Sequence, residues 1–552
     1  MILVAAVALF LLLAHALAPR AMERFFGFLE SIFARISHRP TFALAFLFFG
    51  IIAVRIALLS LLPVPSPGIH DEFSYLLMGD TFAHGRLANP THPMWLSFET
   101  FHVNWFPTYS SMYPPAQGAV LALGQLLGLP WIGVLLSAAA MCAATYWMLC
   151  AWIPARWAFL GGSLAALKLG LTSYWTNSYW GGAVAAIGGA LVLGALARIF
   201  KRANLPDAVL LGVGIAILAN SRPYEGLVFC LPVTFLFLRW LWQKSKSKSA
   251  SGGIPWIKVV APLGVMLLLT VTFMGYYNWR LTGNALLFPH TLNVKTYHTA
   301  PMFLWQTAKP EKQYNNDRFE EFYNGWEREE YTRSWRGVHD VSFVKTERLA
   351  LTFFWLGALF AIPGLPFALR DRKLQALWFT LALVLIAVYL IVWSNAHYAA
   401  PVTCLLFALL VQSLRHLRTM GTMRFAWGKA LARASVLLLF VSTAIAAAHK
   451  ECDPLYWTCT GDQSRTLVLQ KLQAEPGRHL VMVRYNNDDL SIHDEWVFNG
   501  ADIDGAKILW ARELDKTQNE KLFHYFKGHK IWLATTEDGH LVFGPYEPPK
   551  DE

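Results

Sequence analysis

The sequence predicts an α-helical polytopic membrane protein with a small α/β soluble domain at its C-terminal end. Of its 552 residues, 55% are hydrophobic and only 15% are charged, and the mean hydropathy is +0.37. These values are typical of membrane proteins rather than of soluble domains. Many apolar runs also approach the roughly 20 residues that a membrane span requires.

About twelve spans are expected. The first, residues 1–18, resembles an uncleaved anchor because basic residues follow it. The others are predicted near residues 41–62, 131–152, 157–174, 181–198, 207–220, 224–241, 257–276, 349–369, 375–394, 399–414 and 433–449. Short links rich in Lys and Arg fall on one side, which the positive-inside rule makes cytoplasmic. These links carry much of the formal charge of +11, so nucleic-acid binding is not expected.

Residues 1–449 are therefore expected to form the membrane domain, with long loops 63–130 and 277–348 outside the cytoplasm. Residues 450–552 are expected to form an extracytoplasmic α/β domain. Its strands are predicted at 479–485, 506–512, 530–535 and 540–546, and its helices at 464–474 and 518–526. Cys452 and Cys459 are predicted to form a disulfide if this end of the chain lies in an oxidising compartment.

The tetrapeptide "IHDE" occurs at residues 69–72 and again at 492–495. The first copy opens a loop rich in Trp, Phe, Tyr and His. On a helix Asp71 and Glu72 point about 100° apart, so one carboxylate can face a site while the other contacts the scaffold. The alternative is that both acids only stabilise the start of a helix. The second copy follows a polar stretch and is predicted to be a solvated loop that includes Asp488, Asp489, Asp494 and Glu495.

The Asp71–Glu72 pair after an early span, "DTFAHGRL" at 80–87 and "YPPAQG" at 113–118 together resemble the C-type integral-membrane glycosyltransferases. This superfamily includes protein O-mannosyltransferases and aminoarabinose transferases. The resemblance covers about the first 240 residues and continues more loosely to "NAHYAAP". It implies transfer of a sugar from a polyprenyl-phosphate donor to a protein, lipid or glycan acceptor outside the cytoplasm. It also implies that Asp71 and Glu72 are the catalytic residues, with Asp71 as the general base or acceptor-positioning carboxylate. The protein is then expected in a bacterial inner membrane, with its C-terminal domain on the periplasmic side.

Because the leaving group is a phosphate anion, cationic or hydrogen-bonding groups are expected to face it. The candidates are Arg86, Arg222, His290, Lys295 and Tyr297. An Arg222–Glu225 ion pair and a solvent-exposed Lys295 are the structural alternatives. The substrate groove is expected to draw on Tyr75, His102, Tyr113, Tyr179, Trp180, Glu225, His397 and Tyr398. Tyr179 and Trp180 could equally belong to an aromatic belt, and His397 could be a packed histidine.

Asn177 stands where some relatives carry a further acidic residue, which puts a second catalytic carboxylate in doubt. No metal-binding motif is present, although a divalent cation at Asp71 or Glu72 stays open. Two other functions also stay open. A transporter or lipid flippase would line its path with charged residues, of which Arg55 and Lys168 are the candidates within spans. A catalytically inactive scaffold of the same fold would retain the architecture without the chemistry.

Overall fold

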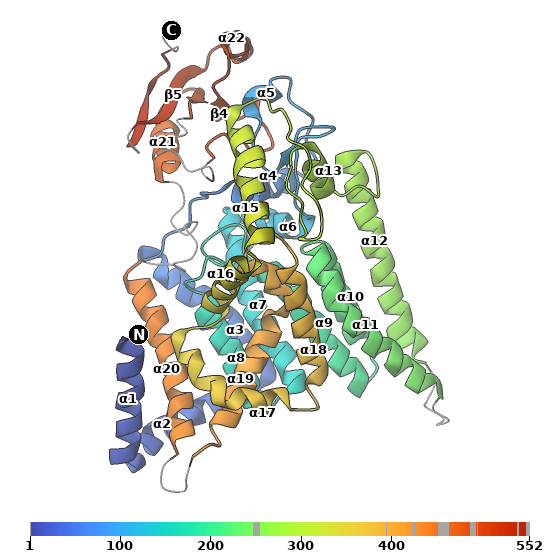
Figure 1. Cartoon of the computed structure of the whole chain (residues 1–552), viewed down its shortest axis with the longest axis vertical. Coiled ribbons are helices and arrows are strands. Elements are labelled where there is room, and N and C mark those ends of the chain that lie inside the picture. The colour runs from blue at the N-terminus through green and yellow to red at the C-terminus, as the bar shows by residue number, and fades with distance from the viewer. Residues whose placement is uncertain are drawn as a thin grey trace.

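The computed structural model describes residues 2–246, 254–393, 395–421, 426–450, 463–485, 493, 495–537 and 540–547. A bundle of long helices forms most of the molecule, and a small sheet domain lies at one end of it (Figure 1). Parts of both long loops, including α4, α5, α13 and α15, lie between the helix bundle and the sheet domain (Figure 1). Cys452 and Cys459 lie outside the described residues, so their predicted disulfide stays a prediction.

Seven helices in the described ranges are long and apolar enough to cross a membrane. They are α3 (Pro40–Ala57) with η1 (Leu58–Ser60), α7 (Pro130–Trp152), α9 (Ala183–Lys201), α11 (Pro223–Lys246), η2 (Trp256–Val260) with α12 (Ala261–Thr282), η5 (Ala396–Val402) with α19 (Thr403–Leu417), and α20 (Trp427–Ala448). Helices α10 (Leu205–Ala219) and α18 (Gln375–Tyr389) are apolar but shorter. Helices α1 (Ile2–Leu17) and α8 (Ala155–Leu169) have 16 and 15 residues. The predicted multi-pass helical fold is confirmed, whereas the number of twelve spans is not.

The segment predicted as one span at 349–369 is bent instead. Helix α16 (Val338–Phe353) and the pair η4 (Leu356–Gly364) and α17 (Leu365–Leu369) meet at 96°. Two extended residues, Phe354 and Trp355, separate them. The indole N–H of Trp355 donates to the carbonyl of Ser435 on α20 at 2.8 Å, which fixes the break against a neighbouring helix. The prediction of a continuous span was wrong because this tertiary contact has no local sequence signal.

Arg55 does not line a path through the membrane. Its guanidinium group is buried and donates to the carbonyls of Leu62 and Pro63 at 2.7 and 3.1 Å and to Oδ1 of Asn177 at 2.8 Å. It also lies 4.8 Å from the ring centroid of Trp131. Arg55 therefore ties the chain after α3 to the loop after α8, which removes one of the two charged residues that favoured a transporter.

Helix α2 (Pro19–Ser37) lies at the end of the bundle opposite the sheet domain (Figure 1). Its Glu30 pairs with Arg418 at 2.6 Å, and its Glu23 pairs with Arg433 on α20 at 2.8 Å. These ion pairs hold α2 against the α19–α20 connection, the region whose basic residues predicted a cytoplasmic side.

The first long loop contains α4 (His70–Ala83), α5 (Trp95–Phe98), the antiparallel pair β1 (Val103–Asn104) and β2 (Ser110–Ser111), and α6 (Pro115–Leu126). Helices α4 and α6 approach each other closely at Gly118. A Cβ atom at this position would lie only 2.2 Å from Sδ of Met78, so no larger residue fits there unless Met78 moves. The second long loop contains α13 (Pro289–Thr296), α14 (Asp317–Phe319), η3 (Glu320–Trp326) and α15 (Glu327–Arg336).

The C-terminal domain forms its predicted strands and helices. Its elements are α21 (Gln463–Ala474), β3 (His479–Val483), β4 (Ile508–Arg512), α22 (Lys516–Tyr525), β5 (Lys530–Glu537) and β6 (His540–Pro545). The sheet order is β4-β3-β5-β6, with β3 parallel to β4 and β5, and β6 antiparallel to β5. One hydrophobic cluster contains both Leu480 and Phe526 of this domain and Phe98 and Trp105 of the first loop. The domain is therefore packed on the loop and does not merely follow the last span.

We predict that Arg55→Met lowers thermal stability and the amount of folded protein in the membrane. The substitution leaves two carbonyls and the Asn177 amide oxygen without their donor, and each buried unsatisfied group costs about 1–3 kcal/mol. Thermal unfolding in detergent, compared with Arg370→Met at an exposed position, measures the effect. An unchanged melting temperature for Arg55→Met would contradict the anchoring role.

Candidate active site

Asp71 lies in the first turn of α4 with three polar side chains around its carboxylate. Tyr113 donates its hydroxyl to Oδ1. Oδ2 lies 3.1 Å from Nδ1 of His70 and 3.8 Å from Nε2 of His102. The Asp71 side chain is 19% exposed, so a small reactant group can still reach it.

The surroundings of Asp71 favour its ionised form. Burial acts to raise its pKa, but His102, His70 and the Tyr113 hydroxyl outweigh this effect and lower it. Burial, with His70 adding to it, lowers the pKa of His102. Burial, together with Asp71, raises the pKa of Tyr113. At neutral pH Asp71 is therefore an anion, and the Tyr113 phenol keeps the proton that it donates.

Glu72 points into the scaffold instead. Its Oε2 accepts the N–H groups of Gly68 and Ile69 at 2.8 and 3.4 Å, and its Oε1 accepts the N–H of Tyr179 at 2.9 Å. The residue is 0% exposed. Burial outweighs these hydrogen bonds and raises its pKa to about 7. The carboxylate satisfies backbone amides just before α4, as capping side chains do, and fixes the loop after α8.

Two buried histidines lie beside Asp71, and a third lies next to them. The ring centroids of His70 and His102 are 4.5 Å apart, and those of His102 and His298 are 6.2 Å apart. His298 pairs with the buried Glu327. Within the described residues, Nε2 of His70, Nδ1 of His102 and Nε2 of His298 are buried and have no hydrogen-bond partner. A reactant can bond to these nitrogens only if the side chains around them move.

His70, Asp71 and His102 also have the arrangement of a divalent-cation site. Each offers one ligand atom, and these atoms lie within 4.8 Å of one another. Two imidazoles and one carboxylate suit a transition-metal ion. His70 and His298 were not predicted as site residues. His70 adjoins Asp71, but "HDE" alone is a weak motif, and only the fold brings His298 of the second loop next to His102.

A second group of polar side chains near Asp71 contains Tyr75, Arg222 and Tyr398. The ring of Tyr75 stacks on that of Tyr113 with centroids 4.3 Å apart. Burial raises the pKa of Tyr75, which Arg222 opposes and Asp71, Tyr398 and Glu225 reinforce. The Arg222 guanidinium lies 4.7 Å from the ring centroid of Tyr398.

Arg222 and the buried Glu225 interact electrostatically, so the alternative of a structural charge pair stays open beside phosphate binding. His397 is buried, with Nδ1 at 3.1 Å from the hydroxyl of Tyr174 and its ring 4.7 Å from that of Trp180. It therefore has the contacts of a packed histidine.

The other candidate donors lie in different surroundings. Arg86 is partly buried and Lys295 is exposed. His290 lines a cavity, and burial lowers its pKa to about 4. Tyr297 is buried and donates to Oε1 of Glu99 at 3.0 Å, within an aromatic cluster of the two loops. Of these four, Lys295 is the most accessible to solvent, His290 and Arg86 are partly accessible, and Tyr297 is buried.

The loop after α8 is a structural element of the site. Asn177 donates to the carbonyls of Leu171 and Ser173 at 3.0 and 2.8 Å and accepts from Arg55. Tyr179 and Trp180 are each 6% exposed, and the Tyr179 hydroxyl donates to the carbonyl of Pro65 at 2.9 Å. These residues support the start of α4 and offer little surface to a sugar.

The second "IHDE" copy can be compared with the predicted solvated loop only at His493 and Glu495. Ile492, Asp494, Asp488 and Asp489 lie outside the described residues, but Glu495 is 1% exposed and pairs with Arg512 at 3.1 Å. The ring centroid of His493 lies 6.0 Å from that of His70. The prediction was wrong for Glu495 because packing against the two long loops, which the local sequence does not encode, buries it.

No protein-family model matches the chain, and no curated protein matches it. Solved structures do. ArnT from Cupriavidus metallidurans is 13% identical in its apo state, with 89% of this chain and 93% of that chain covered and a TM-score of 0.47. In the alignment with the structure of the same ArnT bound to undecaprenyl phosphate, the identity is 15%. That alignment covers 88% of this chain and 92% of ArnT, with a TM-score of 0.45. The oligosaccharyltransferase of Archaeoglobus fulgidus, in a structure tethered with an acceptor peptide, is 10% identical, with a TM-score of 0.40. The match covers 80% of this chain but only 62% of the length of that protein.

We predict that the two adjacent acids respond differently to removal of charge. Glu72→Gln places an amide N–H₂ group against backbone donors and lowers stability by about 1–3 kcal/mol. Asp71→Asn keeps an acceptor for Tyr113 and leaves the melting temperature nearly unchanged. Thermal unfolding of both variants tests this difference, and equal destabilisation would show that the pair is not divided between site and scaffold.

Proposed function

We propose that the chain is a membrane glycosyltransferase that takes a sugar from a polyprenyl-phosphate donor and transfers it to an acceptor outside the cytoplasm, in a bacterial inner membrane. The observation that carries the proposal is the setting of Asp71. An ionised, reachable carboxylate lies between a tyrosine hydroxyl and two imidazoles, at the start of a loop helix that follows the first long span. The donor class comes from the sequence resemblance.

In this reaction the acceptor oxygen forms a bond to the anomeric carbon. The bond between that carbon and the phosphate oxygen breaks, and the polyprenyl phosphate leaves with the bonding electrons. Asp71 accepts the hydrogen bond of the acceptor hydroxyl and takes its proton as the new bond forms. Because its pKa is lowered, Asp71 is a weak base, so its main contributions are orientation of the hydroxyl and negative charge beside the developing oxocarbenium character.

Arg222 is the group best placed to receive the donor phosphate. Stacking on Tyr398 holds the guanidinium plane and leaves its N–H edge for phosphate oxygens. Arg222 lies at the junction of α10 and α11, two helices of the membrane domain. Both Arg222 and Asp71 are close enough to Tyr75 to interact with it electrostatically. Arg222 and Asp71 therefore lie at the same site. The cation of Arg222 suits the leaving phosphate, and the carboxylate of Asp71 suits the incoming hydroxyl.

A small hollow lies near Arg222, next to Asn220, between α12, the α10–α11 junction and the two long loops. It holds only about 20 Å³, roughly the space of one water molecule. Its lining is mainly apolar, with Met112, Met274, Tyr277 and Phe288, and it adds His290 as a polar group. This lining suits an isoprene unit of the donor, which can enter only if these side chains move apart.

We predict that Asp71→Asn lowers the rate of sugar transfer by about 100-fold or more, within the range for a lost general base. The assay follows transfer from an undecaprenyl-phosphate sugar by purified protein in detergent. Binding of undecaprenyl phosphate should stay within about twofold of wild type, because the variant keeps Arg222. Full activity in Asp71→Asn would remove the assignment.

We predict that Arg222→Met weakens binding of undecaprenyl phosphate by about tenfold to 100-fold, as expected for one lost charge-assisted contact of roughly 1.5–3 kcal/mol. Arg370→Met, at an exposed position directly after α17, is the control. Binding is measured by titration of the lipid in detergent. Equal affinities in both variants would place the phosphate elsewhere.

A further inference from the structure

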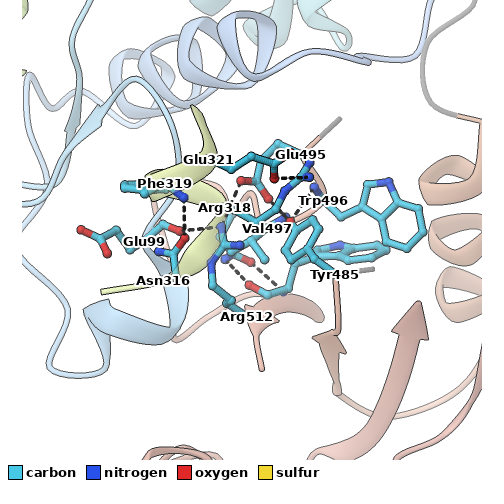
Figure 2. A network of polar contacts seen from close by, with 12 residues as sticks. Glu99, Asn316, Arg318, Phe319, Glu321, Tyr485, Glu495, Trp496, Val497 and Arg512 are labelled. Carbon is cyan, nitrogen blue, oxygen red and sulfur yellow. Dashed lines mark hydrogen bonds and ion pairs between the residues drawn. The ribbon is translucent and has the colours of Figure 1, made fainter. Parts of the chain in front are cut away.

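A buried polar network joins the C-terminal domain to both long loops (Figure 2). At its centre Arg512, the last residue of β4, pairs through Nη2 with Oε2 of Glu495 at 3.1 Å. The same nitrogen donates to the backbone carbonyl of Glu99, in the first loop, at 3.3 Å. Arg512 and Glu495 are 2% and 1% exposed. One guanidinium group therefore bonds to the domain and to the loop.

Tyr485, which follows β3, brings the second loop into the same network. Its ring centroid lies 4.7 Å from the guanidinium carbon of Arg512 and 5.0 Å from that of Arg318 (Figure 2). Its hydroxyl bonds to Oε1 of Glu495, which also accepts the N–H of Val497 at 2.8 Å. Three distant segments thus meet around two buried charges.

Arg512 depends on Glu495 when the C-terminal domain is packed on the two loops, because its charge is then buried. In the described part of the chain, Nε and Nη1 of Arg512 find no hydrogen-bond acceptor. Glu495 and the Tyr485 ring are therefore the main compensation for its desolvated charge. Loss of either ionic partner would leave the other buried and uncompensated. The network fixes the position of the chain around Glu495.

His493, two residues before Glu495, contacts the rings of the second loop. Its ring centroid lies 4.6 Å from that of Trp326 and 6.4 Å from that of Phe322, both at 89°. It lies 6.0 Å from the ring of His70. Burial, with His70 adding to it, lowers the pKa of His493 to about 4, so the imidazole packs as a neutral ring.

His70 is held by rings from three parts of the chain. Its ring centroid lies 5.3 Å from Phe101, 4.5 Å from His102, 5.2 Å from Phe322 and 6.0 Å from His493. The side chain is 6% exposed, and its Nδ1 lies 3.1 Å from Asp71. Supporting groups of this kind set the orientation of a functional imidazole. The C-terminal domain supplies one of the four rings.

We propose that the C-terminal domain completes the active site. The Arg512–Glu495 pair fixes His493 against His70, and His493 holds the His70 imidazole in the orientation in which it contacts Asp71. His493 is a positioning residue. The kinetic consequence rests on the proposed function, whereas the packing of His70 does not.

The packing is tested without any transfer assay. Diethyl pyrocarbonate acylates accessible neutral imidazoles, and mass spectrometry measures the rate at His70 in the full-length protein. We expect His70 to react several-fold faster in His493→Ala and in Arg512→Met than in wild type. His493→Phe retains a ring and should restore protection. His540→Ala, the same change at an exposed position on β6, should leave the rate unchanged.

If Arg512→Met fails to fold, His493→Ala alone decides the question, because His493 is partly exposed and lies outside any helix or strand. Wild-type protection of His70 in His493→Ala would overturn the proposal. Given transferase activity, His493→Ala should lower kcat by about tenfold, as for supporting residues of other sites. KM for the donor should stay unchanged, and His493→Phe should recover the rate. Increased labelling of His70 in His493→Ala, together with a wild-type protein that transfers no sugar, would support the packing and reject the function.

Discussion

The buried carboxylate of Glu72 is the constraint on which the site depends. It binds three backbone N–H groups from two segments, Gly68–Ile69 and Tyr179. These bonds decide where α4 begins and how it sits on the loop after α8. Because neighbouring helical residues point about 100° apart, an inward Glu72 forces Asp71 toward Tyr113, His70 and His102. The hydrogen bonds of Glu72 to the scaffold therefore set the orientation of the Asp71 carboxylate.

Asp71 consequently has two different neighbourhoods. Tyr75, Arg222 and Tyr398 come from the first loop and from the ends of membrane helices. His70 and His102 belong to the first loop and lie against rings of the second loop. The first group carries a cation close to the membrane domain, and the second carries two imidazoles close to the C-terminal domain. A lipid-borne phosphate and a hydroxyl acceptor would then meet at Asp71.

The sequence predicted the elements that depend on local pattern. These include the helical membrane domain, the four strands of the C-terminal domain, and an acidic pair with one carboxylate free to contact the scaffold. It did not predict contacts between distant segments. The bend after Phe353 depends on Ser435, the Arg222 stacking depends on Tyr398, and the burial of Glu495 depends on Arg512 and both loops. Each joins residues whose proximity follows from packing, so periodicity and composition carry no signal for it.

The most direct test of the account is a cryo-EM structure of the protein with undecaprenyl phosphate. We expect phosphate density in contact with the Arg222 guanidinium, with the Asp71 carboxylate open to the anomeric position. Density for the phosphate at a site remote from both Arg222 and Asp71, at saturating lipid, would contradict the central claim.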